Sequence, residues 1–75
     1  MRVTIKIIGG LIHQVGFSER EMDIPDGLSL KELLASIRVD EGSPRIVTRN
    51  GKYITPEEKL ADGDRIVVCH LYSGG

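Results

Sequence analysis

Apolar and polar residues alternate along the first eight positions of the chain. Within residues 2–8, an apolar residue occupies every second position, and most positions between carry a charged or hydroxyl group. A period of two is typical of a strand that buries one face. Residues 17–24 repeat the alternation, with Glu19, Glu21 and Asp23 sharing the polar face. The pattern therefore predicts two strands at the start of the chain.

A helix is predicted from Leu30 onwards by the strongest local pattern in the sequence. Ser29 suits the N-cap position, and Glu32 follows three residues later as its capping-box partner. Leu28 is placed to pack against Leu33 as a hydrophobic staple. Apolar residues then recur at helical spacing, which predicts one stripe facing a sheet. The stripe consists of Leu30, Leu33, Leu34 and Ile37.

The second half of the chain reads as a hairpin, a turn and a final strand. Asn50 and Gly51 form the most specific two-residue hairpin sequence, between a strand at 45–49 and a short return at 52–54. Residues 55–58 resemble a capped single turn of helix that carries the next leucine to the core. The last strand is expected to run through residues 65–72.

These elements predict an α+β fold of the β-grasp type. A mixed sheet of four or five strands packs on one α-helix, and the last strand pairs centrally beside the first. We expect residues 1–75 to form one domain, with residues 72–75 as a flexible C-terminal tail. The connection over residues 9–16 is unusually apolar for a loop, so it either folds back on the core or contacts a partner. Its apolar residues are Leu11, Ile12 and Val15.

Composition excludes several classes of function. A formal charge of -1 and 4% aromatic residues without tryptophan provide neither a basic stripe nor a stacking platform, so no nucleic-acid partner is expected. One cysteine cannot form an internal disulfide, and no apolar run approaches the roughly 20 residues of a membrane span. The first residues also lack the apolar stretch of a signal peptide. We therefore expect a soluble cytoplasmic protein with no membrane partner.

The chain finishes in Gly74 and Gly75, directly behind the predicted last strand. Glycines lack a β-carbon, so such a tail can enter a channel that admits only backbone. Its terminal carboxyl group would then be the reactive group. Chain ends also tolerate any residue, and at average glycine content this ending arises about once in 200 chains. The glycines therefore suggest a function only in combination with the rest of the chain.

Four segments together resemble the ubiquitin-like sulfur carriers of the MoaD/ThiS family. They are residues 24–27 before the helix, 49–52 in the hairpin, 60–66 leading into the last strand, and 73–75 at the end. The resemblance covers essentially the whole chain. The family includes the small subunit of molybdopterin synthase and the carrier of thiamin thiazole synthesis. Molybdopterin is the favoured pathway here, and thiamin thiazole is the second.

The resemblance implies a carrier that is not itself an enzyme. An E1-like adenylating enzyme would convert the carboxylate of Gly75 to an acyl-adenylate, and a sulfur donor would replace AMP to give a thiocarboxylate. Gly74 would be the slender spacer that lets Gly75 enter the enzyme. No cofactor is expected to bind stably, because ATP is consumed by the activating partner. A large synthase subunit or a thiazole synthase would then take the sulfur.

The last strand is apolar on both faces, although one helix covers only one face of a sheet. By analogy with the register of ubiquitin, Ile66 and Val68 should face the helix. The opposite face is expected to bind a partner, although a homodimer or a merely hydrophobic central strand would show the same pattern. The predicted partner-binding residues are Val67, Cys69, Leu71 and Tyr72.

The other reactive side chains favour structural interpretations. Cys69 could accept a persulfide, but a lone strand cysteine more often acts as a small hydrophobe. His13 and His70 do not lie at metal-ligand spacing, so no metal site is expected. Two further functions stay open. The first is a ubiquitin-like modifier conjugated to lysine through Gly75, and the second is a non-catalytic β-grasp interaction module.

Overall fold

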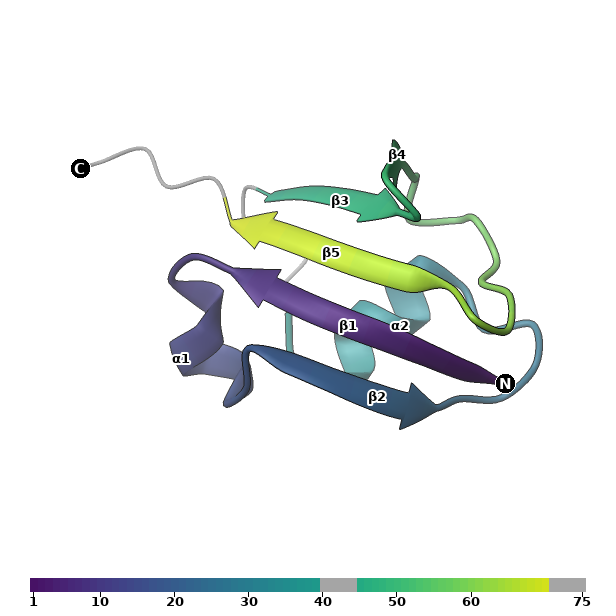
Figure 1. Ribbon diagram of the computed structural model, residues 1–75, viewed down its shortest axis with the longest axis horizontal. Helices are drawn as coiled ribbons and strands as arrows, with labels where there is room; N and C mark the ends of the chain where they lie inside the picture. The colour runs from purple at the N-terminus through teal and green to yellow at the C-terminus, as the bar shows by residue number, and fades with distance from the viewer. Residues whose placement is uncertain (40–44, 71–75) are drawn as a thin grey trace.

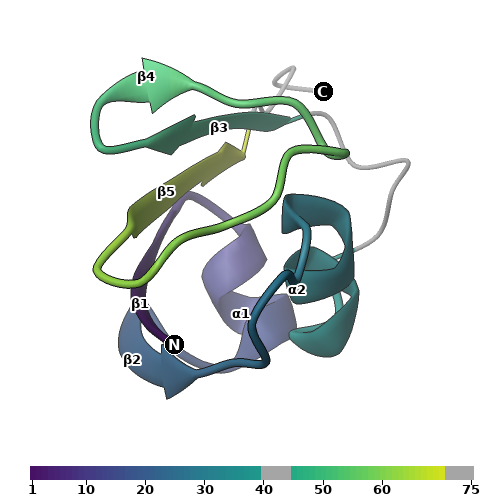
Figure 2. The same ribbon diagram turned by 90° about the vertical axis from the view of Figure 1, so that its right-hand side faces the viewer.

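The computed structural model describes residues 1–39 and 45–70, which form five strands and two helices. The strands are β1 (Arg2–Ile8), β2 (Glu19–Asp23), β3 (Arg45–Arg49), β4 (Lys52–Tyr53) and β5 (Arg65–His70). The helices are α1 (Leu11–Val15) and α2 (Leu30–Ser36). All five strands form one mixed sheet in the order β2-β1-β5-β3-β4 (Figure 1). Both helices lie on the same side of it (Figure 2).

Strand β5 occupies the centre of the sheet. It pairs in parallel with β1, where Ile66 lies opposite Ile5, and antiparallel with β3, where Val68 lies opposite Val47. Both of its backbone edges are therefore hydrogen-bonded, as the β-grasp prediction requires. The sheet order and the helix together confirm the predicted α+β fold.

One hydrophobic core lies between the sheet and α2. Ile66 and Val68 of β5 are fully buried, which confirms that these two side chains face the helix. Alternate residues of β1 contribute to the same core, as the period of two predicted. The core positions of the predicted helix stripe are also buried. They are Leu30, Leu33, Leu34 and Ile37.

The predicted capping box at the start of α2 is present. The amide of Glu32 donates to the Ser29 hydroxyl oxygen at 3.2 Å, and the Ser29 amide donates to a Glu32 carboxylate oxygen at 3.1 Å. The backbone hydrogen bond from Ser29 lowers the pKa of Glu32 below its usual value of 4.5. Because folding lowers the pKa of Glu32, this hydrogen bond stabilises the fold fully at pH values above the usual pKa of the carboxyl group. The stabilisation is lost as the pH falls through the folded-state pKa.

The connection between β1 and β2 contains a helix that the sequence pattern did not predict. Helix α1 spans only Leu11–Val15, which is too few residues to display a helical period. Leu11 is 2% exposed and joins the core, while Ile12 and Val15 pack against it. The apolar connection therefore folds back on the core, and the expectation of a single helix was wrong.

Two further elements differ in extent from their predictions. Strand β2 begins at Glu19, two residues later than expected, and β4 covers only Lys52–Tyr53. Residues 55–58 form a hydrogen-bonded turn and not the predicted turn of helix, with the Glu58 amide donating to the Thr55 carbonyl at 3.1 Å. The turn still delivers Leu60 to the core.

A polar cluster around Asp64 fixes the start of β5. Asp64 is 6% exposed, and its carboxylate accepts hydrogen bonds from the Ala61 amide at 2.8 Å and the Asn50 side-chain nitrogen at 3.1 Å. The Asn50 side-chain oxygen accepts from the Arg65 amide at 2.8 Å. Asn50 itself has a φ of 52°, as a tight hairpin turn requires. The hairpin is thereby tied to the central strand.

We predict that Asp64→Ala destabilises the domain by about 2–3 kcal/mol, because it leaves buried donors without their charged acceptor. Asp26→Ala provides a matched control, since Asp26 is exposed and its described ion pair is with the N-terminal ammonium group at 3.4 Å. That change should cost less than about 0.5 kcal/mol. Urea denaturation measures both values. Equal midpoints for the two variants would show that the Asp64 cluster does not stabilise the fold.

Candidate functional site

The face of the sheet opposite α2 has no helix over it among the described residues. We call it the outer face. On it, the registers of β1, β5 and β3 align the side chains in two rows across the sheet. Cys69 lies between Ile8 and Ile46 in one row, and Val67 lies between Lys6 and Thr48 in the other.

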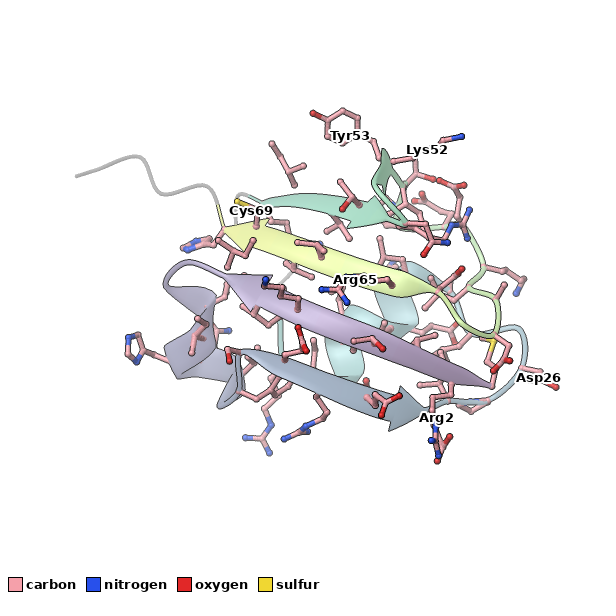
Figure 3. All side chains as sticks on the ribbon, viewed as in Figure 1. Arg2, Asp26, Lys52, Tyr53, Arg65 and Cys69 are labelled. Atoms are coloured by element: carbon pink, nitrogen blue, oxygen red, sulfur yellow. The ribbon has the colours of Figure 1, made fainter. Side chains whose placement is uncertain are left out.

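Four of these side chains form an apolar patch on the outer face, which consists of Ile8, Ile46, Val67 and Cys69. Ile8 is 44% exposed and Ile46 is 37% exposed, and the other two are half-buried. Tyr53, which is 81% exposed, pairs with Thr48 and extends the apolar surface to β4 (Figure 3). Ile8, Ile46 and Tyr53 are the exposed large apolar side chains of the described chain, so this surface concentrates them.

The patch lies where the central strand ends. Cys69 stands at the C-terminal end of β5 (Figure 3), one residue before the last described position. The other predicted site residues, Leu71, Tyr72, Gly74 and Gly75, lie outside the described residues. The structure thus places Val67 and Cys69 on the predicted outer face, directly before the segment that carries the two glycines.

A close contact with the loop after β1 positions the end of β5. Gly9 has a φ of 98°, and a Cβ built on it would lie 3.2 Å from the Cβ of His70. Only glycine fits this approach without displacing its neighbour. Among residues 1–39 and 45–70, none forms a hydrogen bond with the buried Nδ1 of His70. The end of the strand is therefore fixed by backbone packing.

Charged groups border the apolar patch towards the start of β5. Arg65 forms an ion pair with Glu19 at 3.7 Å, and Figure 3 shows Arg65 on the face of the sheet turned to the viewer. Both side chains are more than half exposed, so this pair contributes little to stability. Lys6 lies opposite Glu19 in the β1–β2 pairing and is exposed. The outer face therefore combines an apolar end with a charged end.

The described side chains do not assemble a metal-binding cluster. Within residues 1–39 and 45–70, no cluster of three or more histidine, cysteine or acidic residues could hold a metal ion. His13 is exposed on α1, and His70 lies at the end of β5 beside Gly9. Cys69 is a free thiol between two isoleucines, as expected for a small hydrophobe. The arrangement can dock a protein and present the chain that follows.

Sequence reasoning missed three contributors to this surface: Ile8, Ile46 and Tyr53. Two of them had a detectable signature, because Ile8 follows Ile7 and Ile46 precedes Val47. Adjacent apolar residues in a strand must point to opposite faces. One member of each pair therefore had to lie outside the core.

No described helix is long and apolar enough to cross a membrane.

The face assignment predicts opposite outcomes for two neighbouring residues of β3. Val47→Ala should destabilise the domain by about 2 kcal/mol, because Val47 is buried and its truncation leaves a cavity. Ile46→Ala should cost less than half as much, since this side chain is already partly in water. Thermal and urea unfolding measure the difference. A larger loss for Ile46→Ala would reverse the assignment of the two faces.

Solved structures share this fold. A protein assigned as molybdopterin converting factor subunit 1 from Pyrococcus furiosus superposes with a TM-score of 0.79 at 24% identity, covering 93% of this chain and 97% of that chain. Small archaeal modifier protein 1 from Haloferax volcanii gives a TM-score of 0.76 at 18% identity, covering 92% of this chain and 95% of that chain. Both likenesses concern the fold.

A structure of the complex of subunits 1 and 2 of molybdopterin-converting factor from Helicobacter pylori also matches. Its TM-score is 0.67 at 25% identity, with 100% of both chains covered. No curated protein matches the chain by sequence. The ThiS family model matches residues 5–75, which is nearly the whole sequence. The chain therefore belongs to the ThiS family, the ubiquitin-like sulfur carrier family that the sequence motifs indicated.

Proposed function

We propose that this protein is a sulfur carrier whose Gly75 carboxylate is activated and converted to a thiocarboxylate by partner enzymes. The observation that supports this most is the position of the apolar patch. It lies at the end of the central strand, directly before the segment with Gly74 and Gly75. A partner bound to the patch would receive the following residues at its surface.

The chemistry explains why the carrier needs a partner. A carboxylate is a poor acyl donor because oxide is a poor leaving group. Its oxygen therefore attacks the α-phosphorus of ATP, and pyrophosphate leaves. A persulfide sulfur then attacks the acyl-adenylate carbon, AMP leaves, and a thiol reduces the resulting acyl disulfide to the thiocarboxylate. The carrier itself supplies no acid or base in these steps.

The two glycines have different roles in this proposal. Gly75 carries the reacting carboxyl group, and Gly74 is the spacer without a β-carbon that allows a narrow channel around the chain. The thiocarboxylate stays ionised at neutral pH, as thiolates do when their pKa is low, and so keeps a nucleophilic sulfur. A reducing compartment preserves such a group, which supports a cytoplasmic location for the proposed carrier.

The proposed partners are an E1-like adenylating enzyme, a sulfur donor and a synthase subunit that accepts the sulfur. The Helicobacter pylori complex, which joins subunit 1 to subunit 2 at 25% identity to this chain, supports a synthase subunit. We therefore favour molybdopterin synthesis over thiamin thiazole synthesis. Fold likeness to the archaeal modifier supports a second candidate, in which a lysine amine attacks the same activated Gly75 and forms an isopeptide bond.

Intact-mass spectrometry distinguishes these functions. The protein is incubated with an E1-like enzyme of this family, ATP and a persulfide donor. We expect replacement of one oxygen by sulfur at the C-terminal carboxyl group. Lysine-linked adducts in place of the sulfur product would favour the modifier, and an unchanged mass would refute both.

Two variants provide the control for the tail. Gly74→Val adds a β-branched side chain to the spacer, and a chain with one residue appended after Gly75 moves the carboxyl group. Both should fold as the wild type does, since neither change touches the described core, and both should lose adenylation. ATP–pyrophosphate exchange measures that step. Wild-type exchange rates in either variant would contradict the channel proposal.

We predict that Val67→Glu weakens binding to the adenylating enzyme at least about tenfold, because it places a charge within the apolar patch. Ala35→Glu is the matched control, since Ala35 is exposed on α2, on the opposite side of the sheet. Both variants should melt cooperatively. Calorimetric titration with the enzyme measures the affinity, and equal loss in the two variants would exclude the patch as the docking surface.

A further inference from the structure

A second surface lies on the helix side of the sheet, away from the apolar patch. It is a groove of about 200 Å³ lined by the end of α1, the start of β2 and the end of α2. We call it the edge groove. We propose that the edge groove binds an acidic, partly apolar segment of a partner protein through Arg20 and Arg38. This proposal does not depend on the sulfur chemistry, because the groove and the patch lie on opposite sides of the sheet.

Apolar side chains form part of the lining of the edge groove. Val15, Phe17 and Met22 line it as partly buried side chains that pack against the core, and Ile37 beside them is buried. These residues offer a contact for one apolar side chain of a partner. The groove is smaller than the roughly 300–1,000 Å³ of small-molecule sites, so its size suits one or two side chains of a polypeptide better than a cofactor.

Two arginines, Arg20 and Arg38, line the groove together with these apolar residues. The Arg20 guanidinium carbon lies 4.2 Å from the centre of the Phe17 ring, and Arg38 reaches the groove from the end of α2. Neither forms an ion pair with a described carboxylate. By contrast, Arg2, Arg49 and Arg65 each do. Two like charges at one groove repel each other, and an acidic occupant would relieve that repulsion.

Arg38 occupies a backbone position that normally favours glycine. Its amide donates to the Ala35 carbonyl at 3.1 Å, and the Val39 amide donates to the Leu34 carbonyl at 2.9 Å. These two bonds form the Schellman motif that ends a helix, and its left-handed residue is usually glycine. Here the residue is Arg38, with a φ of 69°. A non-glycine residue in this conformation is strained, so a side chain kept there points to a function.

A hydrogen bond holds the strained residue against α1. The side-chain nitrogen of Gln14 donates to the Arg38 carbonyl at 2.9 Å. The backbone of Arg38 is therefore fixed relative to the end of α1, which contributes Val15 to the groove. Arg20 is presented from the edge strand β2. The two arginines thus come from separate segments and line one groove beside apolar side chains, an arrangement that is complementary to an acidic segment with an apolar anchor.

A selection with random phage-displayed peptides tests the proposal on the full chain. Peptides selected against the wild type should share acidic residues next to an apolar residue. On titration with such a peptide, the amide NMR signals of Phe17, Arg20 and Arg38 should shift. The absence of an acidic consensus, or shifts confined to Val67 and Cys69 on the outer face, would overturn it.

Three variants separate binding from folding. Arg38→Gly should melt no lower than the wild type, because glycine relieves the left-handed strain, yet bind the selected peptide at least about tenfold more weakly. Arg20→Gln should lose affinity similarly, while Lys52→Gln, which removes an exposed charge elsewhere, should not. Wild-type affinity in Arg38→Gly would refute the proposal. Inorganic phosphate that bound as tightly as the peptide would also refute it, since the groove would then recognise charge alone.

Discussion

The parallel pairing of β1 with β5 is the constraint on which the rest of the structure depends. Parallel strands cannot be joined by a tight turn, so the chain between them must cross over the sheet. In this protein the crossover contains α2, which covers one face. The pairing also places β5 between β1 and β3, so both edges of the central strand are paired over residues 66–69. A rigid strand therefore leads to the residues that follow it.

The same constraint creates a face that folding alone does not use. With α2 on one side, the core needs only the inward residues of β5, Ile66 and Val68. Polar residues at the outward positions would suit a face in contact with water, as in antiparallel sheets that have one solvated face. Here Cys69 instead lies between two exposed isoleucines. Keeping apolar groups in water offers the fold no benefit, so a docking function explains them better than stability does.

How much could be predicted depended on whether the determinants were local. The capping box at Ser29 and the Asn50–Gly51 turn act over a few residues, so the sequence alone indicated α2 and the hairpin. Helix α1 is fixed instead by the burial of Leu11 in a core built from distant segments, and its local pattern is too short to show. The outward direction of Val67 and Cys69 followed from the analogy with the register of ubiquitin. The position of Ile8 and Ile46 beside Cys69 required strand registers that no local pattern encodes, and the edge groove required three elements to meet.

The two ends of β5 differ in a way that suits a carrier. At its start, the buried carboxylate of Asp64 and the side chain of Asn50 join the strand to the hairpin through directional hydrogen bonds. At its end, the close approach of Gly9 and pairing with β3 position His70. Directional side-chain bonds therefore fix the start of the strand, and backbone contact fixes its end. Since the patch and the edge groove lie on opposite sides of the sheet, one partner could hold the domain while another received the residues beyond β5.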